Sequence, residues 1–198
     1  MKDYALYYSY KGMGDVLLIV FDNDLATTKS ETIGNVVALY NNDKLIGYNI
    51  FDIKEVIKIK SQGLIYYPSE QFLSVINSIL KNAKLPTLDT KENSGYFIGQ
   101  IVEIDDEVIQ LNDGFVALSK DQSLKAGNKV VFASVGTYLN NGKVVKETNE
   151  NGYRINAHIC TNKELGINDD DTILVLDEDE QVGKDFISLE EDLWMKWN

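Results

Sequence analysis

From Tyr96 to Leu176 the sequence is a succession of short β-branched and aromatic runs separated by turn-forming residues. Two of these turns, Asn112-Asp113-Gly114 and Asn140-Asn141-Gly142, place residues that readily adopt positive φ where a hairpin needs them. Short strands at this spacing predict a small barrel or sandwich. The predicted strands are residues 96–104, 107–111, 115–119, 129–135, 143–147, 153–160 and 172–176.

The residues before Tyr96 combine strand and helix patterns. Residues 14–21, 35–40 and 44–51 are β-type runs, and the last two flank Asn41-Asn42-Asp43, a composition suited to a hairpin turn. The front of the chain is therefore expected to contain a sheet.

A helix is predicted after Ser69, because apolar residues recur at helical spacing up to Ala83 and Ser69 is a good N-cap. Residues 53–60 fit a short helix or a strand, and the pattern leaves both open. A second helix start is indicated at Thr161 and Glu164, because these two residues have capping-box spacing. They predict a short helix directly after a strand.

The periodicity stops near Leu85-Pro86, and a polar stretch at 89–95 follows before the next strand. We therefore predict an α+β fold with an N-terminal α+β domain at 1–88, an all-β domain at 95–187 and a tail at 188–198. Leucine and tryptophan side chains in the tail either pack back on the protein or contact a partner. These residues are Leu189, Leu193, Trp194 and Trp197.

The net charge of −12 is distributed unevenly. Residues 1–95 carry 10 basic and 11 acidic groups, whereas residues 96–187 carry 8 and 17. An acidic surface repels phosphate, so the overall charge disfavours nucleic acid as a partner, although a local basic patch is compatible with it.

The first residues lack the order of a secretory signal, and no apolar stretch reaches the ~20 residues that cross a bilayer. The single cysteine, Cys160, cannot form an internal disulfide. We therefore expect a cytoplasmic protein that does not contact membranes. Lysine is abundant and Arg154 is the only arginine, which suggests an AT-rich, bacterial coding bias.

Several segments resemble a known family. Ile-Cys-Thr-Asn-Lys-Glu-Leu-Gly-Ile at 159–167, followed by the strand at 172–176 and Gly183, is similar to the end of a tRNA-binding OB domain. That domain occurs in endothelial monocyte-activating polypeptide II and is appended to methionyl- and phenylalanyl-tRNA synthetases. Residues 126–136 resemble its central strand. Residues 12–19 and 47–51 resemble the front domain of a bacterial two-domain tRNA-binding protein family.

The resemblance implies that the C-terminal domain is an OB barrel and that tRNA or another structured RNA is the partner. An OB barrel binds RNA with basic and aromatic groups on one face. The candidate RNA-binding residues are Lys129, Lys143, Lys146, Arg154, His158 and Lys163. Three of them, Lys143, Lys146 and Arg154, are expected on neighbouring strands, where they either form one patch or remain scattered charges.

The family usually has a His-Pro-x-Ala-Asp-x-Leu segment after the first strand, and this chain instead continues from Ile104-Asp105-Asp106 into Glu107. Together with the acidic barrel, this loss motivates an alternative function. The alternative is a protein-interaction or dimerisation module that keeps the OB fold without binding RNA. Its partner would be a second copy of the chain, in a homodimer, or another protein.

An enzyme is not expected. His158 and Cys160 share a strand face and are the only residues of their types, so they favour structural or surface roles over a catalytic pair and exclude a zinc site. Asp169-Asp170-Asp171 and residues 177–180 lack the EF-hand order of calcium ligands and predict solvated loops. No cofactor or metal is expected.

A glycine-containing segment and a group of tyrosines near the N-terminus are interpreted as structural rather than ligand-binding features. Gly12-Met13-Gly14 lacks the Gly-Lys-Ser/Thr sequence of a phosphate loop and predicts a turn. The neighbouring tyrosines fit a half-buried strand better than a base-stacking surface. They are Tyr4, Tyr7, Tyr8 and Tyr10.

Overall fold

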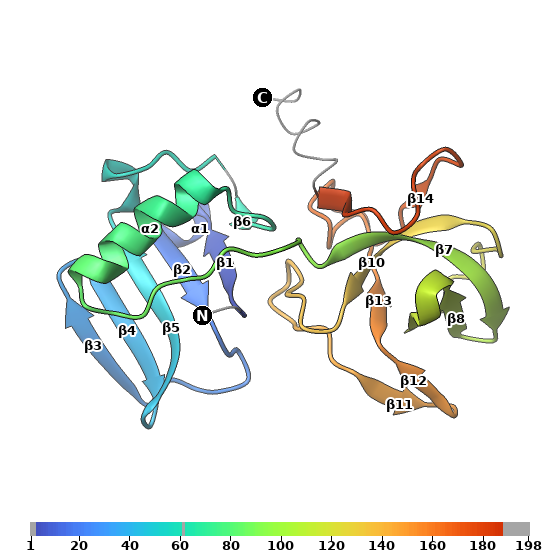
Figure 1. Ribbon diagram of the computed structural model, residues 1–198, viewed down its shortest axis with the longest axis horizontal. Coiled ribbons are helices and arrows are strands. Elements are labelled where there is room, and N and C mark those ends of the chain that lie inside the picture. Colours follow the sequence, from blue (N-terminus) through green and yellow to red (C-terminus); the bar gives the residue numbers. More distant parts are fainter. Residues whose placement is uncertain (1–2, 61, 188–198) are drawn as a thin grey trace. The chain divides into compact units, whose positions relative to one another are not determined.

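The computed structural model describes residues 3–60 and 62–187, and most of its regular structure is β-strand (Figure 1). Of the predicted α+β fold, the predominance of β-structure is therefore confirmed. The elements are β1 (Ala5–Tyr8), α1 (Tyr10–Met13), β2 (Val16–Val20), β3 (Lys29–Ile33), β4 (Val36–Asn41), β5 (Lys44–Phe51), η1 (Ile53–Glu55), β6 (Gly63–Leu64), α2 (Glu70–Asn82), β7 (Tyr96–Asp105), β8 (Val108–Leu111), η2 (Asn112–Gly114), β9 (Val116–Leu118), β10 (Lys129–Ser134), β11 (Thr148–Glu150), β12 (Tyr153–Ile155), β13 (Ala157–Ile159) and β14 (Val175–Leu176).

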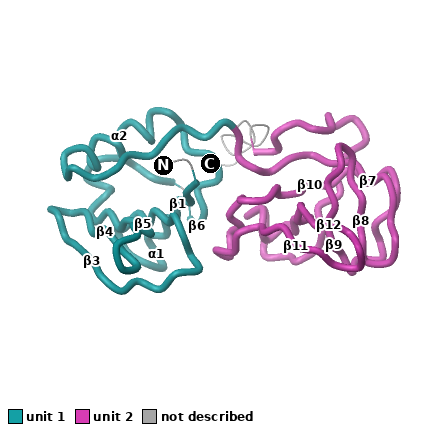
Figure 2. Tube along the Cα trace, turned by 60° about the horizontal axis from the view of Figure 1, so that its bottom comes forward, with its two compact units in different colours: residues 1–92 teal, residues 93–198 magenta. Residues whose placement is uncertain are grey.

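The chain divides into two compact units, residues 1–92 and 93–198, which are coloured separately in Figure 2. Each unit has its own sheet. The roles assigned to the domains from sequence stay predictions.

Unit 1 contains a six-stranded sheet in the order β3-β4-β5-β2-β1-β6, with antiparallel neighbours throughout. Side chains alternate between its two faces, as the period of two in a strand requires. One face carries the buried core, in which Leu17, Tyr48 and Ile50 pack with Ile76 and Leu80 of α2. The helix covers this face of the sheet (Figure 1).

The predicted helix after Ser69 is confirmed. The Ser69 side chain accepts a hydrogen bond from the Phe72 backbone N–H at 3.2 Å, which satisfies one of the unpaired donors at the helix start. Leu73, Ile76 and Leu80 are the fully buried positions and lie on one face of α2, as the apolar spacing indicated.

The hairpin between β4 and β5 forms at Asn41-Asn42-Asp43, with Asn42 at a φ of 52°. Residues 53–60, left open between helix and strand, form the short 3₁₀ turn η1 and then an irregular segment. The predicted turn at Gly12-Met13-Gly14 lies at the end of α1, where Gly14 has a φ of 79°. The strand predicted for the N-terminal tyrosines is confirmed for Tyr7 and Tyr8 in β1, but it is wrong for Tyr10, which lies in α1 and is exposed.

The sheet of unit 2 is nearly closed. Its strands follow the order β13-β10-β7-β8-β9, and β14 pairs with β10 outside this path. Asn156, just before β13, returns to β9, because its N–H donates to the Val116 carbonyl oxygen at 3.0 Å and its Oδ1 accepts from the Val116 N–H at 2.8 Å. The interior is apolar and centres on Phe132, which contacts Phe97 and Phe115.

The predicted strand at 143–147 is wrong. Val144 makes only an isolated bridge to Tyr138, and the neighbouring strands are β11 and β12. These strands form a hairpin around Asn151-Gly152, whose φ angles of 54° and 82° suit a two-residue turn. Asn151 and Gly152 both tolerate the positive φ that such a turn requires, so the segments on either side can pair as β11 and β12.

The predicted strand at 153–160 is interrupted at Asn156, whose side chain bonds β9 instead of continuing one ladder. The strand predicted at 172–176 is shorter, since β14 contains only the last two of these residues. The short helix predicted after Thr161 is also wrong, because the chain forms hydrogen-bonded turns there and ends them at Gly166, whose φ is 71°.

The tail residues Leu189, Leu193, Trp194 and Trp197 lie outside the described residues. Within residues 3–60 and 62–187, no helix has the length and apolar character needed to span a membrane.

Candidate nucleic-acid interface

The six basic residues predicted to bind RNA occupy three different parts of unit 2. Lys143, Lys146 and Arg154 lie in the long connection between β10 and β13. Lys129 begins β10, His158 lies in β13, and Lys163 follows in the turn after it. The structure therefore groups three of the six in one connection and assigns the other three to separate local contacts.

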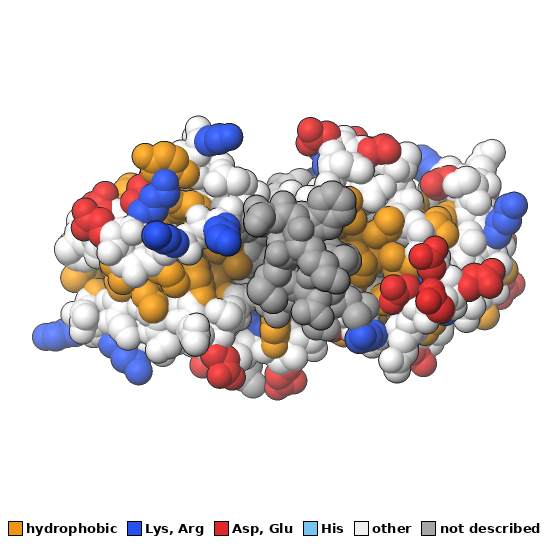
Figure 3. All heavy atoms as spheres, turned by 90° about the horizontal axis from the view of Figure 1, so that it is seen from above, with side chains coloured by type: hydrophobic (Ala, Val, Ile, Leu, Met, Phe, Trp, Pro, Cys, Tyr) orange, Lys and Arg blue, Asp and Glu red, His pale blue; other side chains and the backbone are white. Residues whose placement is uncertain are grey.

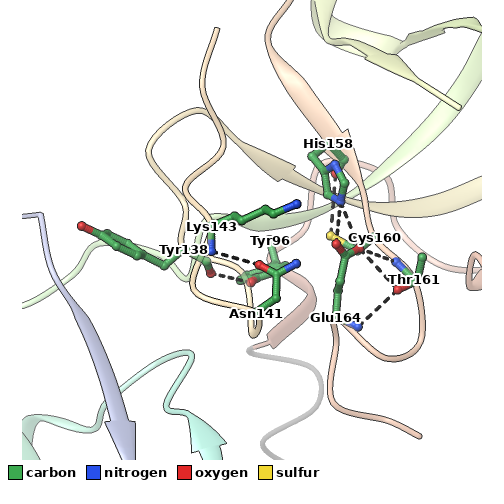
Figure 4. Close-up of polar contacts among 8 residues, drawn as sticks. All are labelled: Tyr96, Tyr138, Asn141, Lys143, His158, Cys160, Thr161 and Glu164. Carbon is green, nitrogen blue, oxygen red and sulfur yellow. Dashed lines mark hydrogen bonds and ion pairs between the residues drawn. The ribbon is translucent and has the colours of Figure 1, made fainter. Parts of the chain in front are cut away.

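Lys143 and Lys146 both lie on the segment that returns from the hydrogen-bonded turn at residues 140–142. The Leu139 N–H donates to the Lys143 carbonyl oxygen at 2.8 Å, and the Val145 N–H donates to Thr137 at 2.9 Å. The side-chain oxygen of Asn141 accepts from the Lys143 N–H at 2.9 Å (Figure 4). These bonds hold the backbone while both lysines remain exposed.

Arg154 forms an ion pair with Glu147 across the start of the β11–β12 hairpin, with an N–O distance of 2.5 Å. The hydrogen bond from Arg154 lowers the pKa of Glu147, and the hydrogen bond to Glu147 raises the pKa of Arg154. Both side chains are exposed, so water and salt weaken the pair and a competing phosphate can replace the carboxylate.

Lys129 and Lys163 contact acidic loops of their own unit. The Lys129 ammonium donates to the backbone carbonyl oxygens of Glu178 and Glu180, the latter at 2.6 Å. Lys163 lies 3.6 Å from Asp171. Lys129 therefore helps to position the loop after β14.

His158 is bound to Glu164, with Nε2 at 3.0 Å from both carboxylate oxygens (Figure 4). The same carboxylate accepts hydrogen bonds from the Thr161 N–H at 3.0 Å and the Thr161 hydroxyl at 3.3 Å. The Thr161 hydroxyl oxygen accepts from the Glu164 N–H in return, which confirms the capping-box contacts. Burial raises the pKa of Glu164, but these hydrogen bonds outweigh it and hold the pKa below its ordinary value.

Cys160 is fully buried behind this cluster. Burial, and then the nearby Glu164 charge, raise the pKa of its thiol well above the ordinary value, which disfavours the reactive thiolate. Its Sγ lies 3.7 Å from the His158 carbonyl oxygen, while the imidazole is engaged by Glu164. This geometry favours a structural role for both residues over a nucleophile–base pair.

The arrangement of carboxylate, imidazole and thiol groups bears on metal binding. Among residues 3–60 and 62–187 no set of three or more His, Cys, Asp or Glu side chains is arranged to hold a metal ion. Asp169-Asp170-Asp171 lies in an exposed loop, where the Asp170 carboxylate accepts from the Thr172 N–H at 3.0 Å.

Sequence reasoning missed one contact that shapes this region. The Tyr153 hydroxyl donates to the Asp105 carboxylate at 3.0 Å, so the β11–β12 hairpin is tied to the turn between β7 and β8. The Asn-Gly pair at 151–152 was the sequence signal that could have located the hairpin and hence Tyr153.

Comparison with known proteins assigns part of unit 1 only. A family model described as a domain of unknown function (DUF4479) matches residues 23–88, which include β3 to α2. No curated protein matches the sequence.

Proposed function

We propose that the protein binds structured RNA of the tRNA class through the unit 2 barrel, adopting an OB fold, and that it catalyses no reaction. Two observations support this function. The first is the resemblance of residues 126–136 and 159–167 to tRNA-binding OB domains. The second is the strand arrangement of the barrel.

The OB fold is a five-stranded, partly open Greek-key barrel. The five strands here are β7, β8, β9, β10 and β13. The first three form a meander, and the fourth, β10, crosses back to pair with the first, β7. The fifth strand then returns toward the third, where Asn156 bonds Val116. This path supports the OB assignment independently of the resemblance.

OB folds bind nucleic acid with the face of strands 2 and 3 and with the loops joining strands 1–2 and 4–5. The first of these loops is acidic here, with Asp105, Asp106 and Glu107. The second is the connection that carries Lys143, Lys146 and Arg154. The presence of these three basic residues at a ligand-binding position of the fold is the observation that carries the proposal.

The test is binding of fluorescently labelled total tRNA, measured by anisotropy at 50 and 200 mM salt. The barrel variant is Lys143→Gln/Lys146→Gln/Arg154→Gln. For single strands, each phosphate contact adds about 0.7 to the magnitude of the slope of log K against log salt concentration. Removing three contacts should therefore reduce that magnitude by about 2. Absence of salt-dependent binding by the wild type at 50 mM salt would refute the function.

A control variant removes the same charge elsewhere, with Lys29→Gln/Lys44→Gln/Lys120→Gln. These lysines form ion pairs with Glu31, Asp22 and Glu107. The control separates a specific loss of contacts from the general effect of a more negative protein. Equal weakening of the barrel and control variants would argue against the barrel site.

A protein-interaction module is the second candidate function. It is favoured by the observation that Arg154, Lys129, Lys163 and His158 all engage groups of their own unit, which reduces the charge available to phosphate. Sedimentation velocity distinguishes the two. Salt-independent self-association without tRNA binding would support this second function.

A further inference from the structure

The strongest unassigned feature of unit 1 is a concentration of lysines in an otherwise acidic protein. Residues 4–14 and 56–69 contain no Asp or Glu, yet they carry Lys11, Lys58 and Lys60. In a chain of net charge −12, these two stretches form a basic surface only if folding brings them together.

The fold does bring them together. β1 pairs with β6, with Tyr8 opposite Gly63, and the Ile65 N–H donates to the Leu6 carbonyl oxygen at 2.8 Å. The Ser9 hydroxyl lies 3.4 Å from the side-chain oxygen of Gln62. The segment leading into β6 is therefore adjacent to the start of α1.

The beginning of that segment is attached to the same place. The Lys54 N–H lies 3.2 Å from both carboxylate oxygens of Asp15, which also accepts from the Tyr8 hydroxyl at 3.1 Å. The Lys54 ammonium lies over the Tyr10 ring, 3.0 Å from its centroid. The segment 54–62 is thus tied to α1 and its flanking residues at both ends.

Lys58 and Lys60 are exposed between these two attachments. They alternate with Ile57 and Ile59, which pack against the unit 1 core. This packing directs the two lysines toward solvent. We call Tyr10, Lys11, Lys54, Lys58 and Lys60 the lysine surface.

The lysine surface differs from the barrel in its charge pairing. Within residues 3–60 and 62–187, Lys11, Lys54, Lys58 and Lys60 make no ion pair with a carboxylate. The nearby acids are Asp15, which accepts the hydrogen bonds described above, and the exposed Asp52 and Glu55 at η1. In the view of Figure 3, basic and acidic side chains are both visible on unit 1, whereas acidic ones predominate on unit 2.

An aromatic group completes the arrangement. Tyr10 is 49% exposed although Lys54 covers part of its ring, and Met13 beside it is 43% exposed. Surfaces that bind RNA strands combine lysines that contact phosphates with aromatic rings on which bases stack.

From this geometry we infer that the lysine surface is a second RNA contact, in which Lys54, Lys58 and Lys60 bind phosphates and a base stacks on Tyr10. The inference rests on the proposed function, because both concern the same RNA ligand. It differs in assigning an RNA-binding role to unit 1, where the matched family model describes none.

The experiment compares wild type, the barrel variant, the control variant and Lys54→Gln/Lys58→Gln/Lys60→Gln in the tRNA anisotropy assay. Loss of three phosphate contacts should make the ratio of Kd at 200 mM to Kd at 50 mM salt about 20-fold smaller. Tyr10→Ala should weaken binding about 5- to 150-fold, and Tyr10→Phe should retain it, because the stacking ring is preserved. Melting curves establish that each variant is folded.

The outcomes separate the two proposals. If wild type binds and the barrel variant is weakened, but the unit 1 variant matches the control, the further inference is overturned and the proposed function stands. If the unit 1 variant is weakened and the barrel variant matches the control, the further inference stands and the barrel site is overturned. Absence of binding by the wild type overturns both.

Discussion

Replacing Glu164 with Gln should destabilise unit 2 and change how its stability depends on pH. Glu164 joins β13 to the following turn, because its carboxylate accepts hydrogen bonds from His158 and from two groups of Thr161. Its side chain is only 16% exposed, so water replaces these bonds poorly. Gln keeps the size and one acceptor oxygen and removes the charge.

The expected loss follows from the hydrogen bonds. A bond to a charged group contributes about 1.5–3 kcal/mol and a neutral one about 0.5–1.5 kcal/mol, so losing the charge should cost about 1–2 kcal/mol. For a domain of roughly 100 residues this corresponds to a fall of about 4–16 °C in Tm. Differential scanning calorimetry at pH 7 measures it.

The pH dependence provides an independent test. Because the folded-state pKa of Glu164 is lowered from its ordinary value of 4.5, the unfolded chain binds more protons in this range. The contribution of Glu164 is therefore complete above pH 4.5 and is lost as pH falls through the folded pKa. The Tm difference between wild type and Glu164→Gln should shrink below about pH 4.5.

Glu107→Gln is the matched control, since Glu107 is exposed and lies 3.7 Å from Lys120. Its effect should stay within about 0.5 kcal/mol, as for most surface substitutions. The reasoning fails if Glu164→Gln behaves like this control at pH 7. It also fails if the Tm difference stays constant down to pH 3.

Three further outcomes are expected. Gly47→Ala should destabilise unit 1 by at least about 1–3 kcal/mol in urea unfolding, because the new Cβ would lie 2.5 Å from the Ile19 carbonyl oxygen; wild-type stability would disprove this close approach. Ser69→Ala should cost about 1 kcal/mol by removing the cap on the Phe72 N–H, whereas Ser69→Asp should retain most of it. Cys160 should resist Ellman's reagent at pH 8 until the protein is denatured, since burial raises its thiol pKa; rapid native-state reaction would contradict its burial.

Local features of the fold were predictable from the sequence. The α2 N-cap at Ser69, the hairpin turn around Asn42 and the capping box of Thr161 and Glu164 each depend on residues a few positions apart. Backbone preference and short-range hydrogen bonds determine such features wherever the rest of the chain lies. The strand predicted at 143–147 was wrong because Asn140-Asn141-Gly142 and Asn151-Gly152 are both good turns, and tertiary pairing favoured regular strands around the second.

The candidate sites depended on contacts between distant residues. The sequence by itself determined which residues are basic, where the acidic stretches lie and which segments favour strands. Only the tertiary structure decided that Lys129 binds carbonyl oxygens about fifty positions away, and that β1 pairs with β6 to bring the segment after Lys60 beside the start of α1. The physical reason is that charge is a property of each side chain, whereas its availability to a ligand depends on which backbone and side-chain groups folding places beside it.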